Sequence, residues 1–244
     1  MRKGKKGFTL IELMIVIAII AIIAAIAIPG LLSSQRASNE RSASTSLKTL
    51  STAEADFRAN DRDWNHVNDF WTYNVAGLYT MTSCAVATSA GAAGTTDPAI
   101  KLIELSVASA DSEGGAPNTV AGGEYAALST FAVSAAKAGY WYIALINDMS
   151  VSGTVEQTYK IDTIGSTSMG SVHNSSKFGF LAFPDSTSSG KFVFMVNENN
   201  TIFRSATSTA VRPSASSPPG GFSAAPYTDW PTDTNLKALW SKLD

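Results

Sequence analysis

Residues 5–30 read KKGFTLIELMIVIAIIAIIAAIAIPG, and this stretch decides the fold. From Leu13 to Ile28 every residue is apolar. The 21 residues that start at Phe8 hold only two polar side chains, Thr9 and Glu12. A helix of that length is about 30 Å long, which is enough to cross the hydrocarbon core of a bilayer. The sequence therefore predicts a membrane-spanning helix that carries one carboxylate near its start.

The carboxylate of Glu12 needs an explanation in such a helix. A charged residue inside a membrane helix costs about 2.5–3.5 kcal/mol on insertion scales, so it points to a function and to a partner. If the chain is cut between Gly7 and Phe8, the new α-amino group of Phe8 lies four residues before Glu12, about one helical turn away. The amine and the carboxylate can then neutralise each other, within one chain or between neighbouring chains. Between chains, this pair would set the axial register of an assembly.

The residues before the apolar stretch predict its orientation. Four of the first seven residues are basic and none is acidic. By the positive-inside rule, the N-terminus is cytoplasmic and the bulk of the chain is exported. A secretory signal peptide is the alternative, with Ala25-Ile26-Ala27 as its cleavage motif and a soluble mature protein that starts near Ile28. However, the apolar part of a signal peptide usually spans about 7–15 residues, and a discarded peptide has no need of Glu12.

The segment Gly7-Phe8-Thr9-Leu10-Ile11-Glu12-Leu13 resembles the processing site of type IV prepilins and type II secretion pseudopilins. The resemblance implies that a prepilin peptidase cleaves between Gly7 and Phe8 and that the new N-terminus of Phe8 is methylated. It also identifies Glu12 with the acid at the fifth mature position, which acts in assembly. Pro29 matches the family's helix-disrupting proline, and we expect a helix kink there because proline removes a backbone hydrogen bond.

An amphipathic segment follows the apolar stretch and predicts that the helix continues to about Ala59. Its apolar residues are spaced by three or four positions, so they form one stripe along the helix: Ala43, Leu47, Leu50, Ala53 and Phe57. The resemblance implies an α+β, pilin-like fold in which one long N-terminal helix packs on an antiparallel β-sheet. We divide the chain into a prepilin leader (1–7), a transmembrane and assembly helix (8–29), the amphipathic half of the same helix (30–60) and a C-terminal globular α+β domain with Ser/Gly/Pro-rich loops (61–244).

The globular part alternates short apolar runs with turn-rich spacers, which is typical of β-strands. The strands that we expect are Lys101–Val107, Tyr140–Ile146, Val155–Ile161, Phe178–Phe183, Phe192–Val196 and Thr201–Arg204. Both alternating faces of Phe192–Val196 are apolar, which predicts a central strand. Glu124–Lys137 suits either a short helix or a strand, and Asn235–Leu243 suits a final helix.

One loop has the spacing of a calcium site but lacks two of its key residues. Acidic or amide side chains alternate along it, as in a calcium-binding loop: Asp61, Asp63, Asn65 and Asp69. The sixth position is His66 rather than the glycine of the sharp turn, and the twelfth is Thr72 rather than glutamate. These residues are a weak metal candidate, and we expect no metal and no cofactor. The single cysteine, Cys84, cannot form an internal disulfide.

Charge and motifs also exclude several classes of function. Without its first seven residues the chain has 14 basic and 20 acidic side chains, so we expect no nucleic-acid partner. No phosphate loop, metal-binding histidine pattern or nucleophile motif occurs, so we expect no enzyme. The hypothesis is a structural subunit of a type IV pilus or a type II secretion pseudopilus. The alternatives are a secreted or membrane-anchored binding domain with a Sec-type signal or anchor, or a minor pilin at a filament tip.

The same hypothesis defines location and partners. We expect a single-pass protein of the bacterial inner membrane, with its N-terminus cytoplasmic and its C-terminal domain periplasmic. After assembly it would lie in an extracellular pilus (fimbrium) or a periplasmic pseudopilus. Its partners would be copies of itself in a helical filament, the prepilin peptidase and, indirectly, the assembly ATPase and platform machinery.

Overall fold

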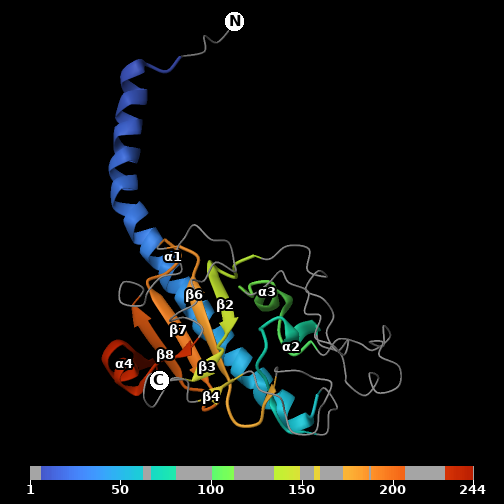
Figure 1. Ribbon diagram of the computed structural model, residues 1–244. Helices are drawn as coiled ribbons and strands as arrows, with labels where there is room; N and C mark the ends of the chain where they lie inside the picture. The colour runs from blue at the N-terminus through green and yellow to red at the C-terminus, as the bar shows by residue number, and fades with distance from the viewer. Residues whose placement is uncertain are drawn as a thin grey trace, which may run out of the picture.

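The computed structural model describes residues 7–62, 67–80, 101–112, 135–148, 157–159, 173–186, 188–206 and 229–243. Within these residues the dominant element is helix α1 (Leu10–Asn60), whose 51 residues make it about 75 Å long. Figure 1 shows the first half of α1 extending away from the rest of the molecule, while its second half lies against a β-sheet. The predicted α+β, pilin-like architecture is confirmed.

Local signals at both ends explain the length of α1. Thr9 is its N-cap, with a side chain that accepts a hydrogen bond from the backbone N–H of Glu12. At the other end Asp61 takes a left-handed conformation (φ 44°), and its N–H donates to the carbonyl of Phe57. The predicted end of the helix at about Ala59 is therefore confirmed to within one residue. The helix is continuous through Pro29, and Figure 1 shows it bending between its free end and the sheet.

The predicted apolar stripe is the face of α1 that packs on the sheet. All five of its residues, from Ala43 to Phe57, are buried. Three polar side chains, Ser46, Ser51 and Glu54, are buried on the same stretch of helix. The first half of α1 has no such contact, and its large apolar side chains from Leu10 to Leu32 are exposed. The helix thus consists of an exposed arm and a half that belongs to the core.

The main sheet has five antiparallel strands in the order β10-β8-β7-β6-β2. These strands are β2 (Tyr140–Ala144), β6 (Gly179–Pro184), β7 (Phe192–Asn197), β8 (Ile202–Ala206) and β10 (Ser241–Leu243). Helix α1 contacts β6, β7 and β8. The prediction that Phe192–Val196 forms a central strand is confirmed, since β7 is the middle strand. Its register pairs Phe194 with both Ala182 of β6 and Arg204 of β8.

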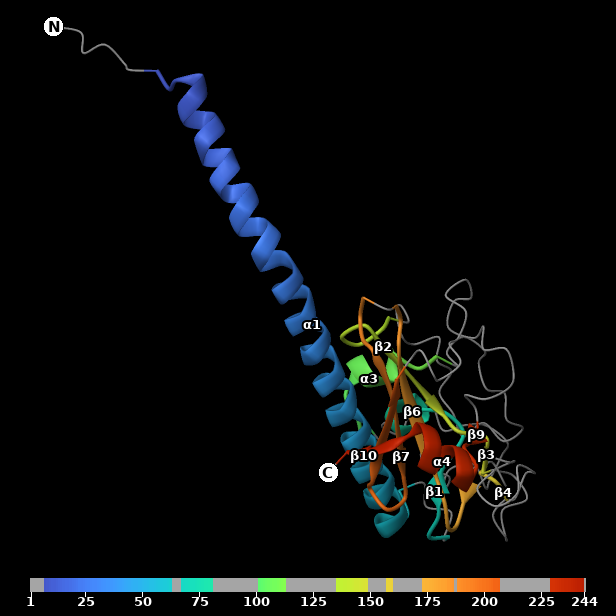
Figure 2. The same ribbon diagram turned by 90° about the vertical axis from the view of Figure 1, so that its left-hand side faces the viewer.

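Smaller elements cover the rest of the sheet. Figure 2 shows helix α4 (Asp233–Leu239) on the side of the sheet opposite α1. A three-stranded sheet lies on that side as well and has the order β4-β3-β9, with β4 at Gln157–Thr158, β3 at Asn147–Asp148 and β9 at Asp229–Trp230. The Trp230 ring of β9 packs edge-on against Phe203 of β8, with ring centroids 5.5 Å apart. Core packing therefore continues on both faces of the main sheet.

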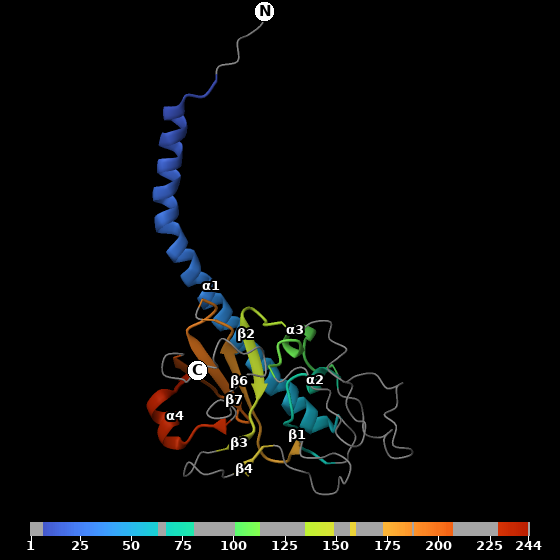
Figure 3. The ribbon, with the colours of Figure 1, turned by 45° about the horizontal axis from the view of Figure 1, so that its top comes forward.

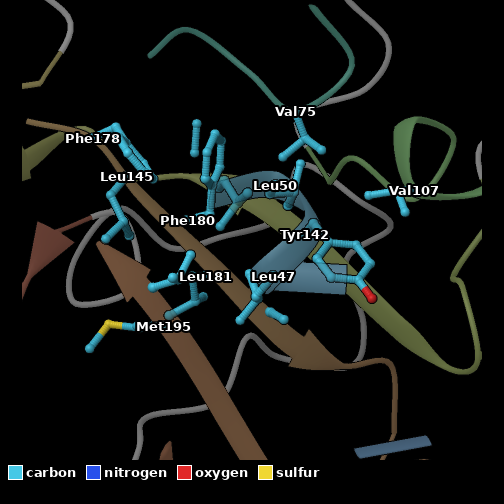
Figure 4. Close-up of a cluster of buried hydrophobic side chains, with 14 of the residues drawn as sticks. Leu47, Leu50, Val75, Val107, Tyr142, Leu145, Phe178, Phe180, Leu181 and Met195 are labelled. Atoms are coloured by element: carbon cyan, nitrogen blue, oxygen red, sulfur yellow. The ribbon is translucent and has the colours of Figure 1, made fainter. Parts of the chain in front are cut away.

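A third group of elements lies beside the last turns of α1. Strand β1 (Phe70–Trp71) pairs antiparallel with β5 (His173–Asn174), and the short helix α2 (Gly77–Thr80) follows β1. Figure 3 shows β1 and α2 next to the C-terminal part of α1. Close packing in this region joins α1 to the sheet, as Figure 4 shows for Leu47 and Leu50 of the helix near Phe180 and Leu181 of β6.

Two predicted elements differ from the structure. Lys101–Val107 is wrong as a strand, because Lys101 has a left-handed φ of 42° and Leu105–Ala108 forms helix α3. Ile103 and Val107 are buried but Leu105 between them is exposed, so burial does not follow the alternation of a strand. The tail is helical only to Leu239. Trp240 is extended (φ −115°, ψ 141°), and the chain ends as β10 on the edge of β8.

The other expected elements are described only in part. Strand β4 is the short piece of Val155–Ile161 that the structure describes. Most of Glu124–Lys137 lies outside the described residues, as does Cys84.

Gly77 provides a test of the packing around β1. A Cβ atom at this position would overlap the indole ring of Trp71, which is buried and whose Nε1 donates to the Asn74 carbonyl at 2.8 Å. Because a rigid ring in a packed core cannot move away freely, we expect Gly77→Ala to lower the free energy of unfolding by about 1–3 kcal/mol. Urea unfolding of the full-length protein in detergent measures this. Gly30→Ala is the control, since nothing lies within 4 Å of the Cβ position there.

Candidate site for processing and assembly

The first turn of α1 places Thr9 and Glu12 in a reciprocal hydrogen-bonded cap. The Oε2 atom of Glu12 accepts from the backbone N–H of Thr9 at 2.8 Å and from the Thr9 hydroxyl, also at 2.8 Å. In return, the Thr9 hydroxyl oxygen accepts from the Glu12 N–H at 3.3 Å. This is a capping box, which satisfies backbone donors that a helix N-terminus leaves free. Thr9 is therefore a direct partner of the carboxylate that defines the site.

The geometry leaves one carboxylate oxygen available for a further donor. Both bonds from Thr9 end on Oε2 of Glu12, and Oε1 accepts none from the part of the chain that the structure describes. Phe8, which directly precedes the cap, is 90% exposed. A Cβ atom placed on Gly7 would have nothing within 4 Å, so the peptide bond between Gly7 and Phe8 is open to solvent. The bond that the motif marks for cleavage is thus accessible in this structure.

The arm beyond the cap exposes a continuous apolar surface. Helix α1 is long and apolar enough to cross a membrane, and its most apolar window has no buried residue. Its exposed large side chains are mostly isoleucine, leucine and methionine: Leu10, Ile11, Leu13, Met14, Ile15, Val16, Ile17, Ile19, Ile20, Ile22, Ile23, Ile26, Ile28, Leu31 and Leu32. A surface of this kind marks a membrane or protein contact, because monomeric soluble proteins rarely expose large apolar patches.

A set of hydrogen bonds marks where the arm meets the globular part. We call it the neck: three side chains of α1 bind the backbone of the loop between β6 and β7. Arg36 Nε donates to the Ser188 carbonyl at 3.2 Å, and Asn39 Nδ2 donates to the Ser189 carbonyl at 3.0 Å. Glu40, which directly follows Asn39, accepts through Oε1 from the Lys191 N–H at 2.8 Å. The neck fixes the loop to the helix at the start of its packed half.

The structure describes two of the four residues of the weak calcium candidate. Asp61 caps the C-terminus of α1, whereas Asp69 is fully buried ahead of β1. Asp63 and Asn65 lie outside the described residues. Among the residues that the structure describes, no group of three or more His, Cys, Asp or Glu side chains could hold a metal ion.

Some functional residues were not expected from the sequence. The cap by Thr9 has a signal, since Thr-x-x-Glu before an apolar run is the pattern of a capping box. The neck residues have no such signal, because their partners are backbone carbonyls and an N–H group about 150 residues away along the chain.

Comparison with known proteins supports this interpretation of the N-terminus. Residues 2–28 match the family described as "Prokaryotic N-terminal methylation motif". The protein "Type IV major pilin protein PilA" of Myxococcus xanthus (strain DK1622) is 58% identical over 52 residues. This match covers 21% of the present chain and 24% of that protein, so it extends over about a quarter of the relative's length. No solved structure matches the chain.

The fold and the site together define a class of protein: an α+β protein whose exposed apolar helix begins with a prepilin-type processing motif. The chain carries the N-terminal methylation motif and is similar, over 52 residues, to a type IV major pilin. Its fold and its motif point to a structural protein rather than an enzyme.

Proposed function

We propose that the chain is a structural subunit of a type IV pilus, which polymerises through the exposed arm of α1. The observation that carries this proposal is the arm itself, with its apolar side chains open along more than twenty residues. Burial of these side chains favours the membrane before assembly and a bundle of identical helices afterwards. In lipid the apolar surface gives little preference between the two, so close helix packing and polar contacts must supply the order.

Glu12 supplies such a polar contact in this proposal. Cleavage after Gly7 by a prepilin peptidase creates an amine on Phe8, and this amine is then N-methylated. In the assembled filament, the amine of one subunit donates to the free Oε1 of Glu12 in a neighbour, while Thr9 holds the other oxygen. A head-to-tail contact that does not close on itself produces an open helical filament. The pair therefore sets the axial register of each added subunit.

The same proposal places the protein in a bacterial inner membrane before assembly. The arm from Phe8 to Pro29 spans the bilayer, with the basic N-terminus in the cytoplasm and the globular domain exported. The assembly ATPase and the platform would be separate proteins that act on the anchored subunit. We name a pilus rather than a pseudopilus because the matched protein of Myxococcus xanthus is a major pilin.

The mature N-terminus tests this proposal directly. We expect mass spectrometry of protein purified from membranes to find N-methylated phenylalanine at position 8 as the first residue. The shared motif is the reason, since the basic leader within it ends in Gly7, immediately before Phe8. A mature start near Ile28 would instead identify a secretory signal peptide. Surface filaments that contain this chain and are absent after deletion of its gene would favour a pilus, whereas filaments confined to the periplasm would favour a pseudopilus.

A further inference from the structure

A buried carboxyl group lies between α1 and β1, outside the site described above. Glu54 is fully buried on the face of the helix that packs on the core. Its Oε2 atom accepts from the backbone N–H of Trp71 at 2.9 Å, which connects the helix to β1. Its Oε1 atom has no hydrogen-bond partner among the residues that the structure describes, and none of their cations forms an ion pair with Glu54.

Such a group is unfavourable in its ionised form. Burial of a carboxylate without a counter-ion costs several kcal/mol, and proteins usually avoid this cost by keeping the group protonated. A protonated carboxyl group keeps one carbonyl-type oxygen, which can accept from Trp71, and carries its proton on the other oxygen. The bonded Oε2 and the open Oε1 of Glu54 match these two roles.

We propose that Glu54 is a proton-binding site of the folded protein, with the proton on Oε1 at neutral pH, and that loss of this proton weakens the contact between α1 and β1. Ionisation would release the proton to solvent and leave a buried negative charge. The hydrogen bond to Trp71 would survive, but the helix and β1 would have to separate for water to reach the charge. Unfolding would then become easier as the pH rises.

The charge that acts on Glu54 agrees with this assignment. Asp69, which is also fully buried, acts on Glu54 from the segment ahead of β1 and repels a second negative charge. Arg58, one turn further along α1, lies over the Phe70 ring at 4.8 Å from its centroid. Asp111 is buried and accepts from the Ala76 N–H at 2.8 Å. On β5, His173 pairs with Trp71 in the backbone register.

The sign of the pH dependence follows from the direction of the shift. Burial raises the pKa of Glu54 well above 4.5; the Trp71 N–H lowers the pKa somewhat, and the charge of Asp69 raises it further. A raised pKa means that the folded protein binds the proton more tightly than the unfolded chain. The bound proton therefore stabilises the folded protein fully below the pKa that Glu54 has in the unfolded chain, near 4.5. This stabilisation is lost as the pH rises through the raised pKa of Glu54 in the folded protein.

Urea unfolding as a function of pH tests the proposal. Urea titrations of the full-length protein in detergent micelles are carried out at several pH values between about 5 and about 8. Tryptophan fluorescence reports the fraction that is unfolded. We expect the unfolding equilibrium constant of the wild type to rise with pH by up to about tenfold per unit. In Glu54→Gln the amide oxygen still accepts from Trp71, but no proton is released, so this rise should disappear. At the upper end of the range the variant should be more stable than the wild type.

A matched control separates this effect from other titrations. Glu40→Gln makes the same change on the same helix at a partly exposed site, and its amide oxygen can still accept from Lys191. This control should keep the pH dependence of the wild type. If the unfolding equilibrium constants of the wild type and of Glu54→Gln changed with pH in the same way, the proposal would be overturned. Infrared spectroscopy gives a second readout. The wild type at neutral pH should show a carboxylic-acid band that Glu54→Gln lacks. A wild-type spectrum without that band would also overturn the proposal.

Discussion

Replacement of Glu12 by alanine is expected to leave cleavage after Gly7 intact and to impair filament assembly strongly. The cleaved bond lies before the helix, but each added subunit would lose the acceptor for its neighbour's amine. A hydrogen bond to a charged group contributes about 1.5–3 kcal/mol, so the affinity for each added subunit should fall by about ten- to a hundredfold. The measurements are mass spectrometry of the N-terminus and the amount of sheared filament. Glu104→Ala, which changes an exposed acid on the globular part, is the control and should assemble normally.

A second substitution at the same position separates the two roles that the structure gives to Glu12. Glutamine at the third helical position can complete a capping box but carries no charge. Glu12→Gln therefore keeps the bonds to Thr9 while it removes the attraction for the amine. We expect it to impair assembly as Glu12→Ala does. Filaments at the wild-type level in Glu12→Gln would show that the cap is sufficient, and the proposed pairing would then be wrong.

The second large effect is expected at the packed half of the same helix. Leu47 is fully buried, and Figure 4 shows it near Leu181 of β6 and Tyr142 of β2. Leu47→Ala removes three carbon atoms from this contact and leaves a cavity, which should lower the free energy of unfolding by about 2–5 kcal/mol. This is a large part of the roughly 5–15 kcal/mol that stabilises a typical protein.

Leu32→Ala is the matched control for this prediction. It makes the same change in the same helix, but Leu32 is 46% exposed and lies on the arm. Urea unfolding of both full-length variants in detergent, followed by fluorescence of the buried Trp71 and Trp141, compares them directly. We expect the Leu32→Ala curve to overlay that of the wild type. An equal decrease in the free energy of unfolding in the two variants would mean that the arm and the globular part unfold together.

Much of the architecture could be predicted because its signals are local. The apolar run, the motif around Glu12 and the spacing of Leu47, Leu50 and Phe57 each depend on residues close together in the sequence. The apolar content of Phe192–Val196 likewise predicted the central strand, since a strand covered on both faces needs no polar alternation. In each case one physical requirement, burial or membrane insertion, determines which residue types are possible.

The errors and omissions involve contacts between distant segments. Lys101–Val107 has apolar residues that fit either period, and the left-handed Lys101 gave no sequence signal. The end of α4 depends on the free edge of β8, which the residues of the tail do not reveal. Burial of Glu54 was missed for a similar reason, because a glutamate on an amphipathic helix is normally assigned to the exposed face.

The neck also has a mechanical consequence. If a filament of these subunits is stretched, tension travels along the helical arms and reaches each globular domain first at Arg36, Asn39 and Glu40. Their three bonds to the loop between β6 and β7 all start within about one turn of α1, so they share the load before the buried stripe bears it. A domain held in this way resists peeling from its helix, and the loop acts as the point at which force enters the sheet.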